Sequence, residues 1–313
     1  MNRVLVPAAL AAGSLLLPQY AQAHAVAGPR LFNNTLILDD PAVADEAALP
    51  TFSWQPPPGS GQEYDFNFEI DKRITEHFGI GINDGYTIQT MPGAKNATGW
   101  QNLFLTLKYQ VYVNPAHEFI ASIGVIREFA RAGSPVLGNN DVGTTTPTLY
   151  WGKGLGDLPI GYLRPLAVTG TIGYQYADKR VGTVTAPEPE PGAPGVVFNN
   201  GLENRWVGGL SIQYSLPYLQ SQVRDIGLPP FLRAVTPIVE LAWSSPASRP
   251  STQGPQYLFG VGVNYLARSY AVGIEALIPA NGQTGRAIGA IAQLHWYFDD
   301  LFPRTLGKPV LSW

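Results

Sequence analysis

Strict alternation of apolar and polar residues is the feature that most constrains what this chain can fold into. In residues 64–71, Tyr, Phe, Phe and Ile alternate with Asp, Asn, Glu and Asp, and the same rhythm returns in residues 103–113, 256–266 and 270–278. Because successive side chains of a β-strand point to opposite faces, each segment is predicted to be a strand with one apolar and one polar face. Segments of about ten residues are longer than most strands of soluble sandwiches and suit tilted strands that cross a membrane.

Composition separates the membrane interpretation from a soluble one. Charged residues make up 14% of the chain, whereas a soluble domain carries roughly 25%. Mean hydropathy is nevertheless zero, and after residue 20 no apolar run reaches the roughly 20 residues of a membrane-spanning helix. A transmembrane β-barrel explains both facts, because its apolar and polar faces cancel in the average. The 34 glycines and 28 prolines fit the turns between many strands.

Several functional classes receive no support from composition. The net charge of −3 gives no basic face for a nucleic acid. The absence of cysteine excludes disulfides, thiolate metal sites and a lipoprotein anchor. No metal-ligand spacing and no glycine-rich phosphate loop is present, so no metal and no cofactor are expected.

The N-terminus has the pattern of a secretory signal peptide in residues 1–23. Arg3 provides the positive charge, Val4–Leu17 is an apolar stretch too short to span a bilayer comfortably, and Ala21-Gln22-Ala23 is a small-residue cleavage pattern. Maturation is expected at His24. A retained anchor helix is the alternative, and Pro7, Gly13 and Pro18 argue against it.

The expected fold is all-β, a closed antiparallel transmembrane β-barrel of about 12 strands, in residues 63–298. Eleven strands are identified by pattern, at 64–71, 78–86, 101–113, 118–129, 146–154, 164–177, 204–216, 232–243, 256–266, 270–278 and 287–298. Single-chain bacterial barrels use an even number of strands. A twelfth strand is therefore expected within residues 24–62, around Leu31–Leu38 or Thr51–Trp54, unless that segment threads the lumen.

The connections and the two ends of the barrel carry further expectations. Short and long connections alternate, as periplasmic turns and outer loops do in this class; Ser215–Phe231 is the exception and is expected to form a small periplasmic helix. The late strands place glycines on their polar face, which leaves room in the lumen. Part of residues 24–62 is therefore expected inside the barrel, and the tail 299–313 against its periplasmic mouth. Disorder of both ends is the alternative.

These patterns resemble bacterial outer-membrane β-barrel proteins. The resemblance rests on the turn at residues 74–81 and on a final strand ending Leu294-His295-Trp296-Tyr297-Phe298. Leu294, Trp296 and Phe298 resemble the signal read by the barrel-insertion machinery of that class. The rhythm of turns and strands is similar to outer-membrane transporter barrels of aromatic-degradation pathways. The resemblance implies a location in the outer membrane, with lipid, lipopolysaccharide, the insertion machinery and a small solute as partners.

The polar faces supply the candidate site residues. The lumen is expected to be lined by Asp65, Asn67, Glu69, Lys108, Gln175, Gln213, Glu240, Asn264 and Glu275. Inward charges either hydrate a channel or pair to hold the lumen shut. No His-x-Ser or Asp-x-His pattern accompanies the four histidines, so no catalytic residues are expected.

Three functions remain in order of preference. The first is an outer-membrane channel or transporter for small solutes, apolar ones included, with a narrow or plugged lumen, because about 12 strands enclose less space than the 16–18 of open porins. The second is a non-transporting barrel that anchors or scaffolds periplasmic partners. The third is a barrel hydrolase.

The loop at Asp178–Glu203 provides a test of the topology. It is the longest expected outer loop and contains the acidic proline run 186–191, which has few means of burying itself. A protease added to intact cells is expected to cut this loop before any other segment. Cleavage that requires permeabilised cells would reverse the predicted orientation.

Overall fold

The computed structural model describes residues 25–57, 61–90, 92–93, 95–137, 141–180, 183–186, 195–198, 202–247, 251 and 253–311. The expected signal peptide and most of the proline run at 186–191 lie outside these ranges.

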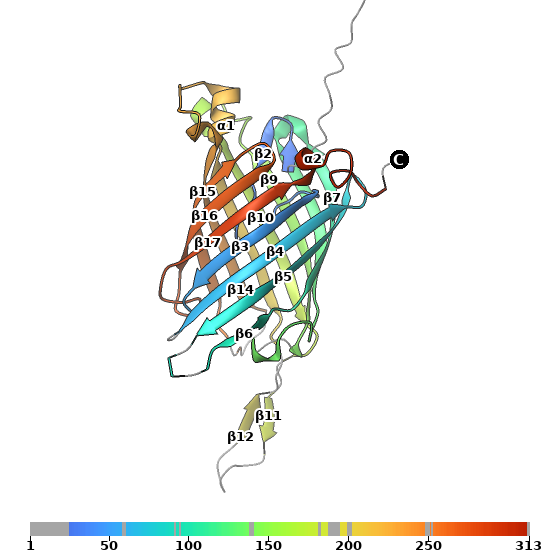
Figure 1. Ribbon diagram of the computed structural model, residues 1–313, viewed down its shortest axis with the longest axis vertical. Helices are drawn as coiled ribbons and strands as arrows, with labels where there is room; N and C mark the ends of the chain where they lie inside the picture. Colours follow the sequence, from blue (N-terminus) through green and yellow to red (C-terminus); the bar gives the residue numbers. More distant parts are fainter. Residues whose placement is uncertain are drawn as a thin grey trace, which may run out of the picture.

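Twelve antiparallel strands close into one barrel (Figure 1). They are β3 (Glu46–Gln55), β4 (Gln62–Arg73), β5 (Phe78–Thr90), β7 (Phe104–Asn114), β8 (Phe119–Glu128), β9 (Thr144–Gly154), β10 (Leu166–Ala177), β13 (Arg205–Tyr214), β14 (Val235–Pro246), β15 (Gln256–Leu266), β16 (Tyr270–Pro279) and β17 (Gly289–Tyr297). Each pairs with its neighbours along the chain, and β3 closes the ring between β17 and β4.

The remaining elements are short. Two small hairpins pair β1 (Ala25–Ala27) with β2 (Arg30–Phe32) and β11 (Thr183–Ala186) with β12 (Gly195–Phe198), and β6 (Ala97–Trp100) pairs with the end of β5. The helical turns are η1 (Pro115–His117), η2 (Pro135–Leu137), η4 (Gly161–Leu163), α1 (Leu216–Tyr218), η5 (Leu219–Val223), η6 (Leu232–Ala234) and α2 (Phe298–Leu301). None of the helices in the described part of the chain has the length and apolarity to cross a membrane.

The fold class is confirmed, and all eleven strands read from the pattern are present. The twelfth is β3, which contains Thr51–Trp54. The other range considered, Leu31–Leu38, forms no barrel strand, because the backbone N–H groups of Leu36 and Ile37 are donated to the Glu240 carboxylate instead of a neighbouring strand.

A second correction concerns the end of the last strand. β17 ends at Tyr297, and Phe298 begins the short helix α2 instead of closing the strand. The chain turns there because Phe298 N donates to the Asp45 carbonyl and the Asp299 carboxylate is bound by Arg73. Leu294 and Trp296 stay within β17.

The outer face of the barrel is apolar over its whole height. Phe66, Val261 and Ile274 are each more than 40% exposed, which would be unfavourable over so large an area in water. Aromatic pairs lie near both strand ends, as in Tyr86–Trp100 at one end and Tyr270–Trp296 at the other. A closed sheet with an apolar band and two aromatic girdles has the features of bacterial outer-membrane β-barrels, and the chain is a barrel of this class.

The two ends of the barrel differ (Figure 1). The short-turn end carries the β1–β2 hairpin, α1 and α2, whereas the β11–β12 hairpin extends from the long-loop end. Short turns are periplasmic in this class, so the short-turn end is assigned to the periplasm. Helical turns at 216–223 fill the long connection Ser215–Phe231.

The C-terminal residues fold back onto the short-turn end. Val310 and Leu311 donate backbone hydrogen bonds to the carbonyls of Arg73 and Ile74. The Arg73 guanidinium lies between the Asp45 carboxylate at 2.7 Å and the Asp299 carboxylate at 2.9 Å. All three side chains are buried, so one arginine joins the N-terminal segment, β4 and the tail.

Replacing Arg73 with methionine tests this junction. The substitution leaves the buried Asp299 carboxylate without a cation and Asp45 with Lys72 alone, and the expected cost is about 3–5 kcal/mol of unfolding free energy. Urea unfolding of the refolded barrel measures it. The control is Arg233→Met, because Arg233 is half exposed and lies 3.9 Å from Asp225; its expected effect is below about 1 kcal/mol. Equal effects of the two substitutions would contradict the junction.

Candidate functional site

Residues 25–45, called the plug below, lie inside the barrel without joining its sheet. Asn33 and Gln213 exchange two hydrogen bonds, each 2.9 Å long, between the plug backbone and the side-chain amide. The Glu240 carboxylate accepts from the N–H groups of Leu36 and Ile37 at 2.8 and 2.9 Å. Wall side chains thus satisfy the backbone of a segment that has no strand partner.

Small wall residues make room for the apolar side chains of the plug. A Cβ at Gly209 would lie 2.1 Å from Leu38, and one at Gly273 would lie 2.6 Å from Leu36. Leu36 also packs against Leu277 and Ile291 beyond the middle of the barrel. The close approach requires glycine at these wall positions, so the wall is shaped to the plug.

Arg30 fixes the plug at the short-turn end. Its buried guanidinium donates to Glu118 Oε2 at 3.0 Å and to the Pro165 carbonyl at 3.0 Å, and it stacks 3.7 Å above the Tyr218 ring. Burial raises the pKa of the Tyr218 hydroxyl to about 12, so the hydroxyl stays protonated and donates to Glu118 Oε1 at 2.6 Å. The network joins the plug to β8, β10 and α1.

Lys108 is bound to the C-terminal part of the plug. Its ammonium donates to Asp39 Oδ1 at 2.6 Å and to the Asp40 carbonyl at 3.1 Å, and lies 4.8 Å from the centre of the Tyr150 ring. The side chain is almost completely buried. A lysine of β7 therefore crosses the plug–wall boundary and pairs with the acidic stretch of the plug.

A small cavity, called the chamber below, lies between this acidic stretch and the wall. Its volume is about 30 Å³. It is lined by Asn34, Thr35, Leu38, Asp39, Asp40, Glu46, Ala48, Glu69, Asp71, Gln293 and His295. His295 Nε2 lies 3.0 Å from Glu46 Oε2.

The lumen toward the long-loop end is lined by polar groups. Asp65 accepts from Ser53 at 3.1 Å, Thr87 at 2.6 Å and Gln101 at 3.2 Å. Gln175 lies across the barrel at 3.5 Å from Thr144. Within the described part of the chain, no plug residue hydrogen-bonds to any of these six side chains.

The nine residues proposed from the pattern divide into three groups in the structure. Lys108, Gln213, Glu240 and Asn264 hydrogen-bond to the plug, and Glu275 lies beside Glu240, its carboxylate above Gly260. Glu69 lines the chamber. Asp65, Asn67 and Gln175 lie toward the long-loop end.

Carboxylates outnumber cations on the inward face of the described strands. The inward carboxylates are Glu46, Glu63, Asp65, Glu69, Asp71, Glu128, Glu240 and Glu275, and the inward basic side chains are Arg73, Lys108 and Arg205. The field of such a wall attracts cations and repels anions.

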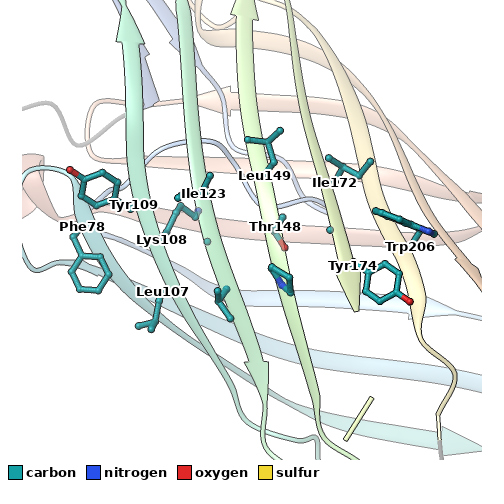
Figure 2. A pocket seen from close by; sticks show the side chains of 14 residues that line it. Phe78, Leu107, Lys108, Tyr109, Ile123, Thr148, Leu149, Ile172, Tyr174 and Trp206 are labelled. Atoms are coloured by element: carbon teal, nitrogen blue, oxygen red, sulfur yellow. The ribbon is translucent and has the colours of Figure 1, made fainter. Parts of the chain in front are cut away.

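A larger groove of about 600 Å³ lies on the outer face, over β5, β7, β8, β9, β10 and β13. Figure 2 shows Phe78 and Tyr109 at one side and Tyr174 and Trp206 at the other, with Leu149 and Ile172 between them. Its exposed surface is almost wholly apolar. The groove belongs to the lipid-facing band and is not a site for a polar solute.

The three histidines in the described residues, His77, His117 and His295, form no catalytic group with a nucleophile. His117 Nδ1 lies 3.4 Å from Asp157, and both side chains are largely exposed. In the described residues, no Ser or Thr hydroxyl hydrogen-bonds to a histidine ring, and no group of His, Asp and Glu is arranged to hold a metal ion.

Sequence reasoning did not identify Arg30, Asn33, Asn34 or Glu46 as parts of the site. The plug has no periodic pattern that would assign a face to its residues. Two signals were available: the small inward residues of the late strands leave space that something must fill, and the acidic stretch Asp39–Glu46 is tolerable inside a barrel but costly against lipid.

Comparisons with known proteins show similarity of fold alone. No protein-family model matches the chain, and no curated protein sequence matches it significantly. The NanC porin is similar with a TM-score of 0.49 at 6% identity, over 80% of this chain and 98% of that one. The beta domain of the Bordetella autotransporter BrkA has a TM-score of 0.48 at 13% identity, over 81% and 99%. The KdgM porin has 0.45 at 12%, over 80% and 99%.

Single cysteines introduced into this cysteine-free chain test the position of the plug. Asp65→Cys and Gln175→Cys are expected to react with a membrane-impermeant thiol reagent. Gln213→Cys and Asn264→Cys are buried beneath the plug and are expected to react roughly tenfold or more slowly until residues 25–44 are deleted. Phe66→Cys, on the lipid face, should not react. Rapid labelling of Gln213→Cys with the plug present would contradict the packing.

Proposed function

We propose that this barrel is a plugged outer-membrane channel for small polar solutes, with a preference for cations. The observation that carries the proposal is that the plug lies in the lumen without being part of the barrel sheet. The twelve strands pair only with one another to close the barrel, and residues 25–45 take no part in this pairing. The plug can therefore leave the lumen while the backbone hydrogen bonds that a membrane barrel requires stay intact.

The lining of the lumen supports solute passage and suggests the type of solute. A barrel built only as an anchor could fill its interior with apolar side chains, as small barrels do. Here the wall is polar from the Asp65 network to the chamber, and its carboxylates lack an equal number of cations. This favours small cationic or neutral polar solutes over the apolar solutes of aromatic-degradation pathways that the sequence resemblance implies.

A disulfide between plug and wall tests the proposal directly. The double variant Leu38→Cys/Gly209→Cys places a cysteine on each side of the contact between plug and wall. A Cβ at Gly209 would lie 2.1 Å from the end of the Leu38 side chain, so the two cysteines are expected to form a disulfide. The oxidised protein is expected to show no conductance in planar bilayers. Reduction is expected to restore a current carried mainly by cations.

Two controls make the result decisive. Deletion of residues 25–44 should give a permanently conducting barrel, and Gly209→Cys alone should not respond to reductant. If the deletion variant folds and neither it nor the reduced double variant conducts, the channel proposal is wrong.

A second function, binding of periplasmic partners by a non-conducting barrel, is favoured by how completely the plug fills the lumen. The plug leaves a chamber of only about 30 Å³, and large apolar side chains are exposed at the short-turn end, among them Ile160, Ile226 and Phe231. These features suit a non-conducting barrel that binds periplasmic partners, and absence of conductance in the deletion variant would favour it.

A further inference from the structure

The chamber has an unbalanced set of charges. Five carboxylates line it, from Asp39, Asp40, Glu46, Glu69 and Asp71. Within the described residues, the only Lys or Arg side chain that forms an ion pair with any of the five is Lys108, which binds Asp39. Glu69 and Asp71 have neither an ion pair nor a side-chain hydrogen bond there. Several negative charges gathered in a narrow lumen without counter-ions are unfavourable.

Two buried polar groups that line the same chamber also lack partners. Asn34 and His295 are more than nine-tenths buried. Asn34 Oδ1 accepts from the Tyr297 hydroxyl, but Asn34 Nδ2 has no hydrogen-bond partner, and neither has His295 Nδ1. Because an unpaired buried polar atom is unfavourable, these groups indicate a polar guest.

The orientation of His295 specifies part of the chemistry. Both ring nitrogens of His295 lack a hydrogen-bond partner, and Nε2 lies 3.0 Å from the Glu46 carboxylate; we assign the proton of the neutral ring to Nε2, which faces that carboxylate. Nδ1 then carries a lone pair and can only accept. A guest at this position must supply a donor.

We propose that the chamber binds the ammonium group of a small protonated amine, which is the solute class of the proposed channel and so rests on that function. A positive charge balances Glu69 and Asp71, N–H donors serve His295 Nδ1 and the carboxylates, and an accompanying water accepts from Asn34. The volume of about 30 Å³ holds about two water-sized groups at about 10–15 Å³ each, which suits an ammonium head with one water and excludes a quaternary head. A metal ion is disfavoured, because the described residues contain no metal-holding group.

Lys108 shows how such a group is recognised here. Its own ammonium is bound at the edge of the chamber by a carboxylate, a backbone carbonyl and an aromatic ring. An incoming amine would compete with Lys108 for Asp39 and weaken one of the polar contacts that hold the plug. Binding of the solute and release of the plug are thereby coupled.

Calorimetric titration of the refolded, full-length mature protein with methylammonium chloride tests the site without using conductance. Saturable binding is expected for methylammonium and not for tetramethylammonium at the same ionic strength. Glu69→Gln/Asp71→Asn is expected to weaken binding about tenfold or more, since charge-assisted hydrogen bonds are lost. The control Asp157→Asn/Asp178→Asn removes two carboxylates outside the lumen and should bind as the unchanged protein does.

A second variant guards against misfolding of the first. Ala48→Met keeps every carboxylate and fills the chamber from β3, so it should abolish binding while circular dichroism shows an intact barrel. Equal binding of methylammonium and tetramethylammonium, or unchanged binding in Ala48→Met, would overturn the site. If the barrel conducts but binds no methylammonium, the site proposed here is wrong and the channel proposal stands. If it binds methylammonium but never conducts, only the channel proposal is wrong.

Discussion

Closure of the sheet by β3 is the constraint on which the rest of the structure depends. In a bilayer the backbone N–H and C=O groups have no water to bond, so a sheet with a free edge is excluded. β3 supplies the last strand, pairing with β17 on one side and β4 on the other. Because β3 follows the plug directly in the chain, closing the barrel also holds residues 25–45 at the lumen.

The plug in turn explains the composition of the inner wall. Glycines at 209 and 273 admit Leu38 and Leu36, and Gln213, Glu240 and Asn264 bond to the plug backbone. The wall thereby does for the plug what a neighbouring strand would otherwise do. These polar contacts are individually modest, about 0.5–1.5 kcal/mol each, which makes a closed but releasable lumen physically reasonable.

Charge is distributed unevenly between the ends of the plug. At the short-turn end Arg30 has a complete set of partners in Glu118, Pro165 and Tyr218. In the C-terminal part of the plug, the acidic residues meet the acidic wall, with Lys108 as the cation bound to them. The first junction is suited to permanent attachment, whereas the second leaves charge uncompensated and is where a solute can act.

The sequence alone determined the strands, their faces and the even strand count, because alternation is a local property that a strand imposes on every second residue. It also placed the lumen-facing side chains and indicated unfilled space beside the late glycines. Only the tertiary structure decided what fills that space. The plug has no period, and its contacts join residues far apart in the sequence, 88 positions in Arg30–Glu118 and 230 in Asn34–Asn264. Such contacts depend on how the closed wall curves, which no local pattern records.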